Sequence, residues 1–267
     1  LQGDAALLAS SCLAIVGSRR PTAQGRDNAR RFAHDLATQG WTIVSGLAAG
    51  VDGAAHEGAL DAGGRTIAVV GTGIDRVYPP SHRALAHRIA ETGLLVSEMC
   101  LGTPPLSANF PQRNRIIAGL SRGTLVVEAA LRSGSLITAR LASEAGREVL
   151  AIPGSILAPQ SAGCHALIRQ GAALVDSPTQ VADELGPLQP QALAVRPPSA
   201  PAAAVTQAPP ADDPVLTALG HDPQSLDTLI DRCGWPAHSL SAHLLVLEME
   251  GRVARLPGGM YQRRQDA

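Results

Sequence analysis

The chain has 267 residues, of which 45% are apolar and 17% charged, so it can form one large domain and a small second one around a substantial core. Its net charge of −1 excludes a global basic field that would attract a polyanion, so a nucleic-acid partner would need a local basic patch. All 22 basic residues are arginines. Codon usage in a GC-rich genome would explain this absence of lysine, and so would a role of the arginines in phosphate binding. Aromatic residues are scarce, with two each of Trp, Tyr and Phe.

Cysteine spacing and hydropathy exclude further classes of protein. The four cysteines form no CxxC pair, so we expect no metal site and no disulfide framework, and the chain is predicted to be cytoplasmic. No apolar run approaches the roughly 18 residues that span a bilayer, so no membrane partner is expected. The segment 5–16 lacks a basic leader and is predicted as a buried strand rather than a signal peptide. The first residue is Leu1 rather than Met, which indicates that upstream sequence has been removed.

Strand-like and helix-like segments alternate from residue 12 to about residue 185. The strand-like runs are short and rich in Val, Ile and Leu, as in parallel strands covered on both faces. The alternation predicts an α/β fold for residues 1–185, an extended Rossmann-like, doubly wound and mostly parallel sheet. The expected strands are Leu13–Val16, Thr42–Val44, Thr66–Val70, Leu94–Val96, Thr124–Val127, Val149–Ile152 and Ala173–Val175, and the expected helices are Ala23–Gln39, Gly53–Ala62, Ser81–Thr92, Arg113–Leu120 and Ser135–Ala145.

The composition changes after residue 185. Residues 186–213 hold seven prolines and eight alanines with little charge, which is typical of a linker partly extended by proline. Residues 214–267 have the pattern of a small winged helix-turn-helix domain. Because its third helix carries Glu248 and Glu250 and little basic charge, binding to DNA and binding to protein remain open for this domain. Its expected elements are helices at Pro214–Leu219, at Leu226–Cys233 capped by Ser225, and from Pro236 to Met249, followed by a hairpin of Arg252–Leu256 and Met260–Arg263.

In an open α/β sheet, ligands bind beyond the carboxyl ends of the strands. The first strand ends in the turn 17–21, whose free amides and Arg19 and Arg20 suit an anion, although a tight turn with solvated arginines is the alternative. The second ends in Ser45 and Gly46, small residues that let a ligand come close. Asp52 is interpreted as a helix cap and His56 as a structural helix residue.

The run 109–117 sets one of the rare rings beside arginines and asparagines at the start of a helix. Phe110 could stack on a base while Arg113 and Arg115 contact phosphate, or it could be a hydrophobic staple. After the fifth strand, Ser133, Gly134 and Ser135 form a second anion-binding turn, with Arg132 beside it.

Signals of catalysis are weak in this sequence. Residues 71–73 form a lone GxG, and neither a complete dinucleotide fingerprint nor a P-loop is present, so no cofactor is expected. Glu128 is the only attractive carboxylate, and it could equally hold an arginine in place. We therefore predict a binding protein rather than an enzyme.

Five runs within residues 12–185, and a sixth that fits with them, carry a resemblance to a known family. They closely resemble DNA-processing protein A (DprA, also called Smf), whose longer members also have the linker and the winged helix. The resemblance implies a homodimer that binds and protects incoming single-stranded DNA during natural transformation and helps to load the RecA recombinase on it in the presence of single-strand binding protein. The runs are Ile15–Pro21, Ser45–Leu60, Asn109–Ser121, Glu128–Ala139 and Arg147–Gly154, with Gly163–Ala172 as the sixth.

The motifs also imply a DNA-binding groove. This sequence departs from the family in two respects, because the N-terminal helical domain of many members is absent and no lysine is available for the groove. The runner-up is a related enzyme, a nucleotide phosphoribohydrolase, although its PGGxGTxxE loop is missing here, and a third class is a regulatory winged-helix protein with a degenerate sensor domain. The groove residues predicted from the turns and the motifs are Gly17, Ser18, Arg19, Arg20, Ser45, Gly46, Asn109, Phe110, Arg113, Asn114, Arg115, Arg132, Ser133, Gly134 and Ser135.

Overall fold

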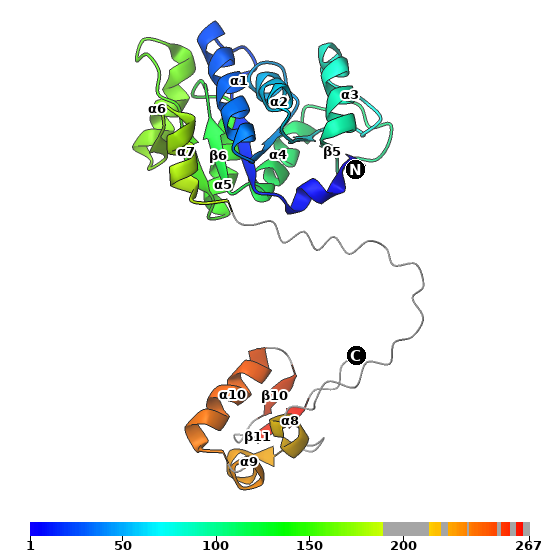
Figure 1. Cartoon of the computed structure of the whole chain (residues 1–267), viewed down its shortest axis with the longest axis vertical. Helices are drawn as coiled ribbons and strands as arrows, with labels where there is room; N and C mark the ends of the chain where they lie inside the picture. Colours follow the sequence, from blue (N-terminus) through cyan, green and yellow to red (C-terminus); the bar gives the residue numbers. More distant parts are fainter. Residues whose placement is uncertain (189–213, 220–223, 234, 250–251, 257–259, 264–267) are drawn as a thin grey trace. The chain divides into compact units, whose positions relative to one another are not determined.

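A computed structural model describes residues 1–188, 214–219, 224–233, 235–249, 252–256 and 260–263. The chain divides into two compact units, Leu1–Arg196 and Pro197–Ala267, which are described separately (Figure 1). Most of the predicted linker, and the Pro-Gly-Gly turn of the predicted hairpin, lie outside the described residues.

The first unit is built on an eight-stranded sheet with the order β1-β5-β4-β3-β2-β6-β7-β8. All neighbouring strands are parallel except for the pair β1 and β5 at one edge. The strand order reverses direction between β2 and β6, which confirms the predicted doubly wound, mostly parallel sheet. The strands are β1 (Gln2–Gly3), β2 (Cys12–Val16), β3 (Thr42–Ser45), β4 (Thr66–Val69), β5 (Leu94–Val96), β6 (Gly123–Val126), β7 (Glu148–Ala151) and β8 (Ala173–Leu174).

Helices cover both faces of this sheet (Figure 1). On one face, α1, α2 and α7 bury a core that includes Phe32, Trp41 and Ile43, and α3 packs beside them over Leu47 and Leu95. On the other face, α4, α5 and α6 pack over Val16, Val69 and their neighbours. The helices are α1 (Ala23–Thr38), α2 (Val51–Asp61), α3 (Arg83–Thr92), α4 (Asn109–Leu120), α5 (Ser135–Glu144), α6 (Ala162–Arg169) and α7 (Pro178–Leu185), with short 3₁₀ helices η1 (Ala5–Ala9), η2 (Pro80–His82) and η3 (Pro159–Ser161).

The prediction of one strand over residues 5–16 is wrong in its first half. Residues Ala5–Ala9 form the 3₁₀ helix η1, and only Cys12–Val16 form the strand. The side chain of Asp4 accepts a hydrogen bond from the Ala6 amide and so begins a helical turn, and Ser10 ends it by donating from its hydroxyl to the carbonyl of Leu7. Apolar composition alone could not distinguish this turn from a strand.

The described residues of the second unit form three helices and a three-stranded sheet, as expected for a winged helix. The side chain of Ser225 accepts a hydrogen bond from the Thr228 amide, which confirms the predicted cap. The sheet order is β10-β11-β9, and β9 is a strand that the sequence pattern did not predict. The elements are α8 (Pro214–Leu219), β9 (Gln224–Ser225), α9 (Leu226–Cys233), α10 (Ala237–Met249), β10 (Val253–Leu256) and β11 (Met260–Arg263).

Arg122 holds the segment after α7 in place. Its guanidinium donates hydrogen bonds to the carbonyl oxygens of Leu185 and Pro187, and it lies over the ring of Trp41 at 5.4 Å. Leu188 then packs against Gly40 and the core beneath. These contacts fasten the chain after α7 to the body of the sheet.

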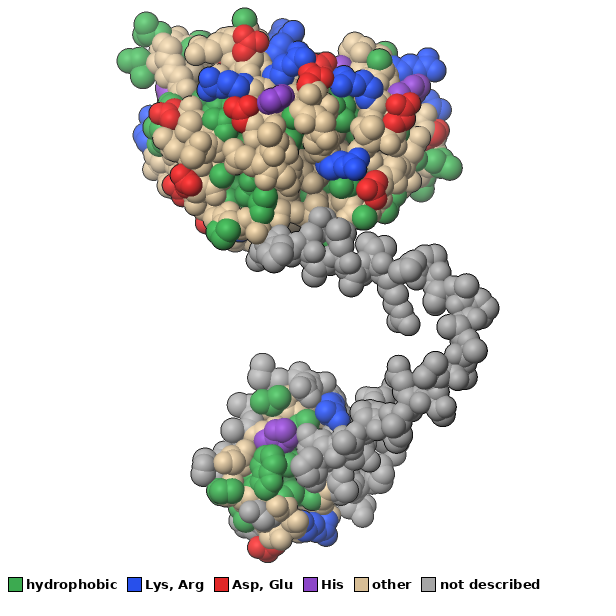
Figure 2. Space-filling model, viewed as in Figure 1, with side chains coloured by type: hydrophobic (Ala, Val, Ile, Leu, Met, Phe, Trp, Pro, Cys, Tyr) green, Lys and Arg blue, Asp and Glu red, His purple; other side chains and the backbone are tan. Residues whose placement is uncertain are grey.

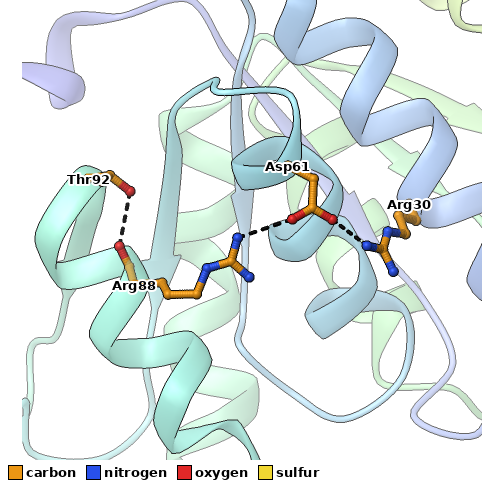
Figure 3. Close-up of polar contacts among 4 residues, drawn as sticks. All are labelled: Arg30, Asp61, Arg88 and Thr92. Atoms are coloured by element: carbon orange, nitrogen blue, oxygen red, sulfur yellow. Dashed lines mark hydrogen bonds and ion pairs between the residues drawn. The ribbon is translucent and has the colours of Figure 1, made fainter.

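Charged side chains of both signs are interspersed on the face of the first unit that Figure 2 shows, in keeping with the low net charge. One group links three helices: Asp61 of α2 accepts hydrogen bonds from Arg30 of α1 and Arg88 of α3 (Figure 3). These side chains are partly exposed, so salt screens the pairs and we expect each to contribute about 1 kcal/mol or less. Within the described residues, no helix has both the length and the apolar character that crossing a bilayer requires.

Candidate functional site

A cleft opens where the strand order reverses. Because the connections from β2 and β6 leave toward opposite faces, the carboxyl ends of these strands leave a crevice between them. Its volume is about 640 Å³, within the range of sites that bind small ligands. The lining residues come from the turns after the strands and from the first turns of α4 and α5: Val16, Gly17, Ser18, Arg19, Arg20, Ala48, Asp52, Tyr78, Pro105, Ser107, Phe110, Pro111, Arg113, Asn114, Ile117, Ala130, Arg132, Ser133, Gly134, Ser135, Ile137 and Thr138.

The turn after β2 is held rigidly at the floor of this cleft. The Ser18 amide donates to the carbonyl oxygen of Glu128, and the Ser18 carbonyl accepts from the amide of Val51, at 2.7 and 3.1 Å. The hydroxyl of Ser18 accepts a hydrogen bond from the amide of Arg20. Arg19 and Arg20 are exposed, so this turn presents two cations from a fixed backbone.

Two helix N-termini supply further positive potential. The N-cap residues of α4 and α5, Ala108 and Gly134, make no side-chain capping hydrogen bond, and neither helix has an acidic residue in its first turn. Both helix starts line the cleft, where their dipoles favour an anion. The hydroxyls of Ser133 and Ser135 lie 2.7 Å apart and can turn toward a ligand, and Arg132 is exposed beside them.

Aromatic rings line another part of the cleft. The rings of Phe110 and Tyr78 are tilted against one another, with their centres 5.5 Å apart. The guanidinium of Arg19 lies over the Phe110 ring, also at 5.5 Å. Phe110 packs closely on Gly71, because a Cβ atom at Gly71 would lie 3.0 Å from the ring. Phe110 is therefore both part of the cleft wall and partly a packing residue.

Arg113 borders the cleft, but its N–H groups donate hydrogen bonds within the protein. Its side chain is buried and donates to the carbonyl oxygens of Gly46 and Val69 and to the side chain of Asn114. Burial lowers the pKa of Arg113 to about 10, and the carboxylate of Asp52 opposes that shift. Burial likewise raises the pKa of Asp52, against the charge of Arg113. The hydrogen bonds of Arg113 join the turn after β3 and the end of β4 to α4.

All but four of the predicted groove residues line the cleft. Ser45 and Gly46 are buried beneath it, where the Ser45 hydroxyl donates to the carbonyl of Ile15 and the space beside Gly46 is filled by the guanidinium of Arg113 rather than by a ligand. Asn109 is buried and donates to the carbonyl of Gly71. Arg115 lies outside the cleft and pairs with Glu98.

Several lining residues were not predicted as part of the groove. Tyr78 is one of only two tyrosines, and the rarity of rings that drew attention to Phe110 applied to it equally. Asp52 was predicted to cap its helix, whereas it lies inside the first turn of α2 and accepts hydrogen bonds from the amides of Gly46 and Ala48 in the preceding turn. Nothing in the sequence pattern placed Pro105 at this edge.

Glu128, the one candidate catalytic carboxylate, has a structural role, and so has His56, as predicted. Both carboxylate oxygens of Glu128 accept hydrogen bonds from Thr22, one from the amide and one from the hydroxyl, so Glu128 fixes the start of α1 rather than an arginine. His56 is fully buried in α2, and its Nδ1 lies 2.7 Å from the hydroxyl of Thr66. Burial, with the charges of His82 and Arg113, lowers the pKa of His56 to about 3. Among the described residues, no three His, Cys, Asp or Glu side chains are placed to hold a metal ion.

Fold and site together define a protein with a Rossmann-like unit, whose cleft is lined by arginines and two helix N-termini, and a winged-helix domain. The chain belongs to the DNA recombination-mediator protein A family, whose sequence profile matches residues 1–186. Residues 197–259 match the DprA winged helix domain.

Relatives of known identity agree with this assignment. The protein Smf of Escherichia coli is 44% identical over 272 residues, which cover 99% of this chain and 71% of that protein. The structure of DNA processing protein A from Streptococcus pneumoniae is 50% identical, with a TM-score of 0.65 over 67% of this chain and 63% of that one. A Helicobacter pylori DNA processing protein A, studied for its single-stranded DNA binding mode, is 33% identical, with a TM-score of 0.63 over 69% and 84%. The chain thus spans less than two thirds of the pneumococcal protein.

Proposed function

We propose that the first unit binds single-stranded DNA in the cleft. The observation that carries this proposal is that one cleft combines the exposed arginines Arg19, Arg20 and Arg132, two helix N-termini and two aromatic rings. Cations and helix N-termini bind phosphate, and rings bind the faces of unpaired bases. The Helicobacter relative, which binds single-stranded DNA, gives independent support.

Within this proposal the contacts divide into two kinds. The turn at Ser18 and the turn at Ser133–Ser135 hold phosphates, together with the neighbouring arginines. The rings hold bases without reading their sequence, because every base has an aromatic face and phosphates carry no sequence information. Binding should therefore depend on salt and depend little on sequence.

We further propose that the protein hands its DNA to the RecA recombinase, in the presence of single-strand binding protein, and acts as a homodimer during natural transformation. Membership of the recombination-mediator family supports this step. We assign no catalytic reaction to the chain, because the one attractive carboxylate, Glu128, is already occupied by Thr22. A monomer at micromolar concentration in sedimentation that bound DNA with full affinity would contradict the dimer.

The test compares a labelled single strand with a duplex of the same length, at two salt concentrations, on the full chain. We expect tighter binding of the single strand and weaker binding of it by the variant Arg132→Ala. Arg140→Ala is the matched control, because Arg140 lies in α5, directly after the turn that holds Arg132, but pairs with Glu144 and does not line the cleft. Equal loss in both variants, or tighter binding of the duplex, would contradict the proposed function.

A further inference from the structure

The two sides of the cleft differ in chemistry. The serine turns follow β2 and β6, the central strands where the order reverses. Tyr78 follows β4, and Pro105 and Ser107 follow β5, so these residues lie on the side of the cleft toward the β5 edge. The first side offers amides, hydroxyls and arginines, whereas the second offers ring and proline surface. A ligand that fits both sides has charged groups on one side and flat apolar faces on the other.

The two rings in this cleft are not equally available to a ligand. Phe110 already has three neighbours: the backbone of Gly71, the guanidinium of Arg19 and the ring of Tyr78. Tyr78 is 43% exposed, and the side-chain contact found for it is the one with Phe110. The ring with free surface is therefore Tyr78, and Phe110 supports it from within the cleft wall.

We infer that Tyr78 is the platform on which one unpaired nucleobase stacks, with the adjoining phosphate held at the serine turns. This inference rests on the proposed function and adds to it the position of a base. A ring that is exposed within a cleft and backed by a second ring has the geometry of a stacking platform. Because paired bases are already stacked in a duplex, such a platform also favours single strands over duplex, which phosphate contacts alone do not.

The experiment measures binding of two labelled polymers to the full chain: a thymidine oligomer, and an oligomer of equal length that has the same backbone but no bases. Three variants are compared with the wild type. Tyr78→Ala removes the ring, Tyr78→Leu keeps apolar packing against Phe110 without a ring, and Tyr78→Phe keeps the ring without the hydroxyl. Leu106→Ala is the matched control, because Leu106 is exposed on the same loop as Pro105 but does not line the cleft. Thermal melting of each variant shows that it is folded.

We expect Tyr78→Ala and Tyr78→Leu to bind the thymidine oligomer about 5- to 150-fold more weakly than the wild type, the range of one lost stacking contact. Binding of the abasic oligomer should not change in any variant. Tyr78→Phe and Leu106→Ala should stay within about twofold of the wild type on both polymers, since each keeps the stacking ring.

Other outcomes would overturn the inference. Full binding by Tyr78→Leu would show that packing, not stacking, matters, and a loss in Tyr78→Phe would assign the effect to the hydroxyl. Equal losses on both oligomers would place Tyr78 among the phosphate contacts. Failure of the wild type to bind either polymer would instead contradict the proposed function itself, so the two failures are distinguishable.

Discussion

The guanidinium of Arg19 lies over the ring of Phe110 at 5.5 Å, which joins the turn after β2 to the start of α4. An exposed cation–π contact of this kind contributes about 0.5–1 kcal/mol. It places an exposed cation and a ring next to one another in the lining of the cleft. The two residues should therefore act together.

We expect Arg19→Ala and Phe110→Ala to be non-additive. Each should weaken binding of a single strand, and the double variant should lose less than the sum by about 0.5–1 kcal/mol, because each single change already breaks the contact. A double-mutant cycle on DNA affinity measures this, with thermal melting alongside. A Phe110→Ala protein that melts early but binds normally once folded would rule out a role for this ring in binding.

Arginines inside and outside the cleft should differ in their salt dependence. Each phosphate contact on a single strand contributes about 0.7 to the slope of log affinity against log salt. Arg132→Ala should therefore weaken binding and flatten that slope by about this amount. Arg115→Ala should leave the slope unchanged, because Arg115 pairs with Glu98 outside the cleft. A flatter salt slope in Arg115→Ala would indicate that Arg115 contacts phosphate in the groove after all.

Arg113 should matter for folding more than for binding. Arg113→Ala removes donors from two carbonyl oxygens and leaves Asp52 as a buried charge without its cation, so we expect a loss of about 3–5 kcal/mol in the free energy of unfolding. Arg113→Lys should rescue little, because one ammonium cannot reproduce the guanidinium fork. Urea denaturation measures both, with Arg115→Ala as the control. Wild-type stability combined with lost DNA binding would make Arg113 a direct contact.

His56 makes stability depend on pH. In the unfolded chain its pKa is about 6.5, and in the folded chain it is about 3, so below pH 6.5 the unfolded state takes up a proton that the folded state does not. The free energy of unfolding should therefore fall by about 1.4 kcal/mol for each pH unit from 6.5 toward 3. Denaturation of the wild type and of His56→Gln between pH 7 and 5 isolates this contribution as a difference in slope. If the free energy of unfolding depended on pH with the same slope in both proteins, this contribution of His56 would be excluded.

The order of elements was predictable because the sheet is parallel and covered on both faces. Its strands are continuous apolar runs, and the turns that follow them meet at one edge, which is why Ser18, Arg19 and Ser133 could be placed together. Helices α6 and α7 were not predicted, since each has only eight residues, about two turns, and so short an amphipathic segment is hard to tell from a loop.

Sequence could not predict the partner of each polar side chain. Arg113 and Arg115 belong to the same motif, two positions apart, yet one is buried on the carbonyl of Gly46 and the other is exposed beside Glu98. Residues two apart on a helix face different directions, and only the packing of α4 decides which direction is inward. The same holds for Glu128, whose partner Thr22 lies on a distant segment.

Arg122 fixes the position of the segment that follows α7. Its hydrogen bonds go to the carbonyl oxygens of Leu185 and Pro187, groups that every residue possesses, while Trp41 supports the guanidinium from behind. These hydrogen bonds therefore do not depend on the identity of the side chains that follow. We therefore expect the contacts of Arg122 with Leu185 and Pro187 to persist when the sequence after Leu188 is exchanged, lengthened or shortened.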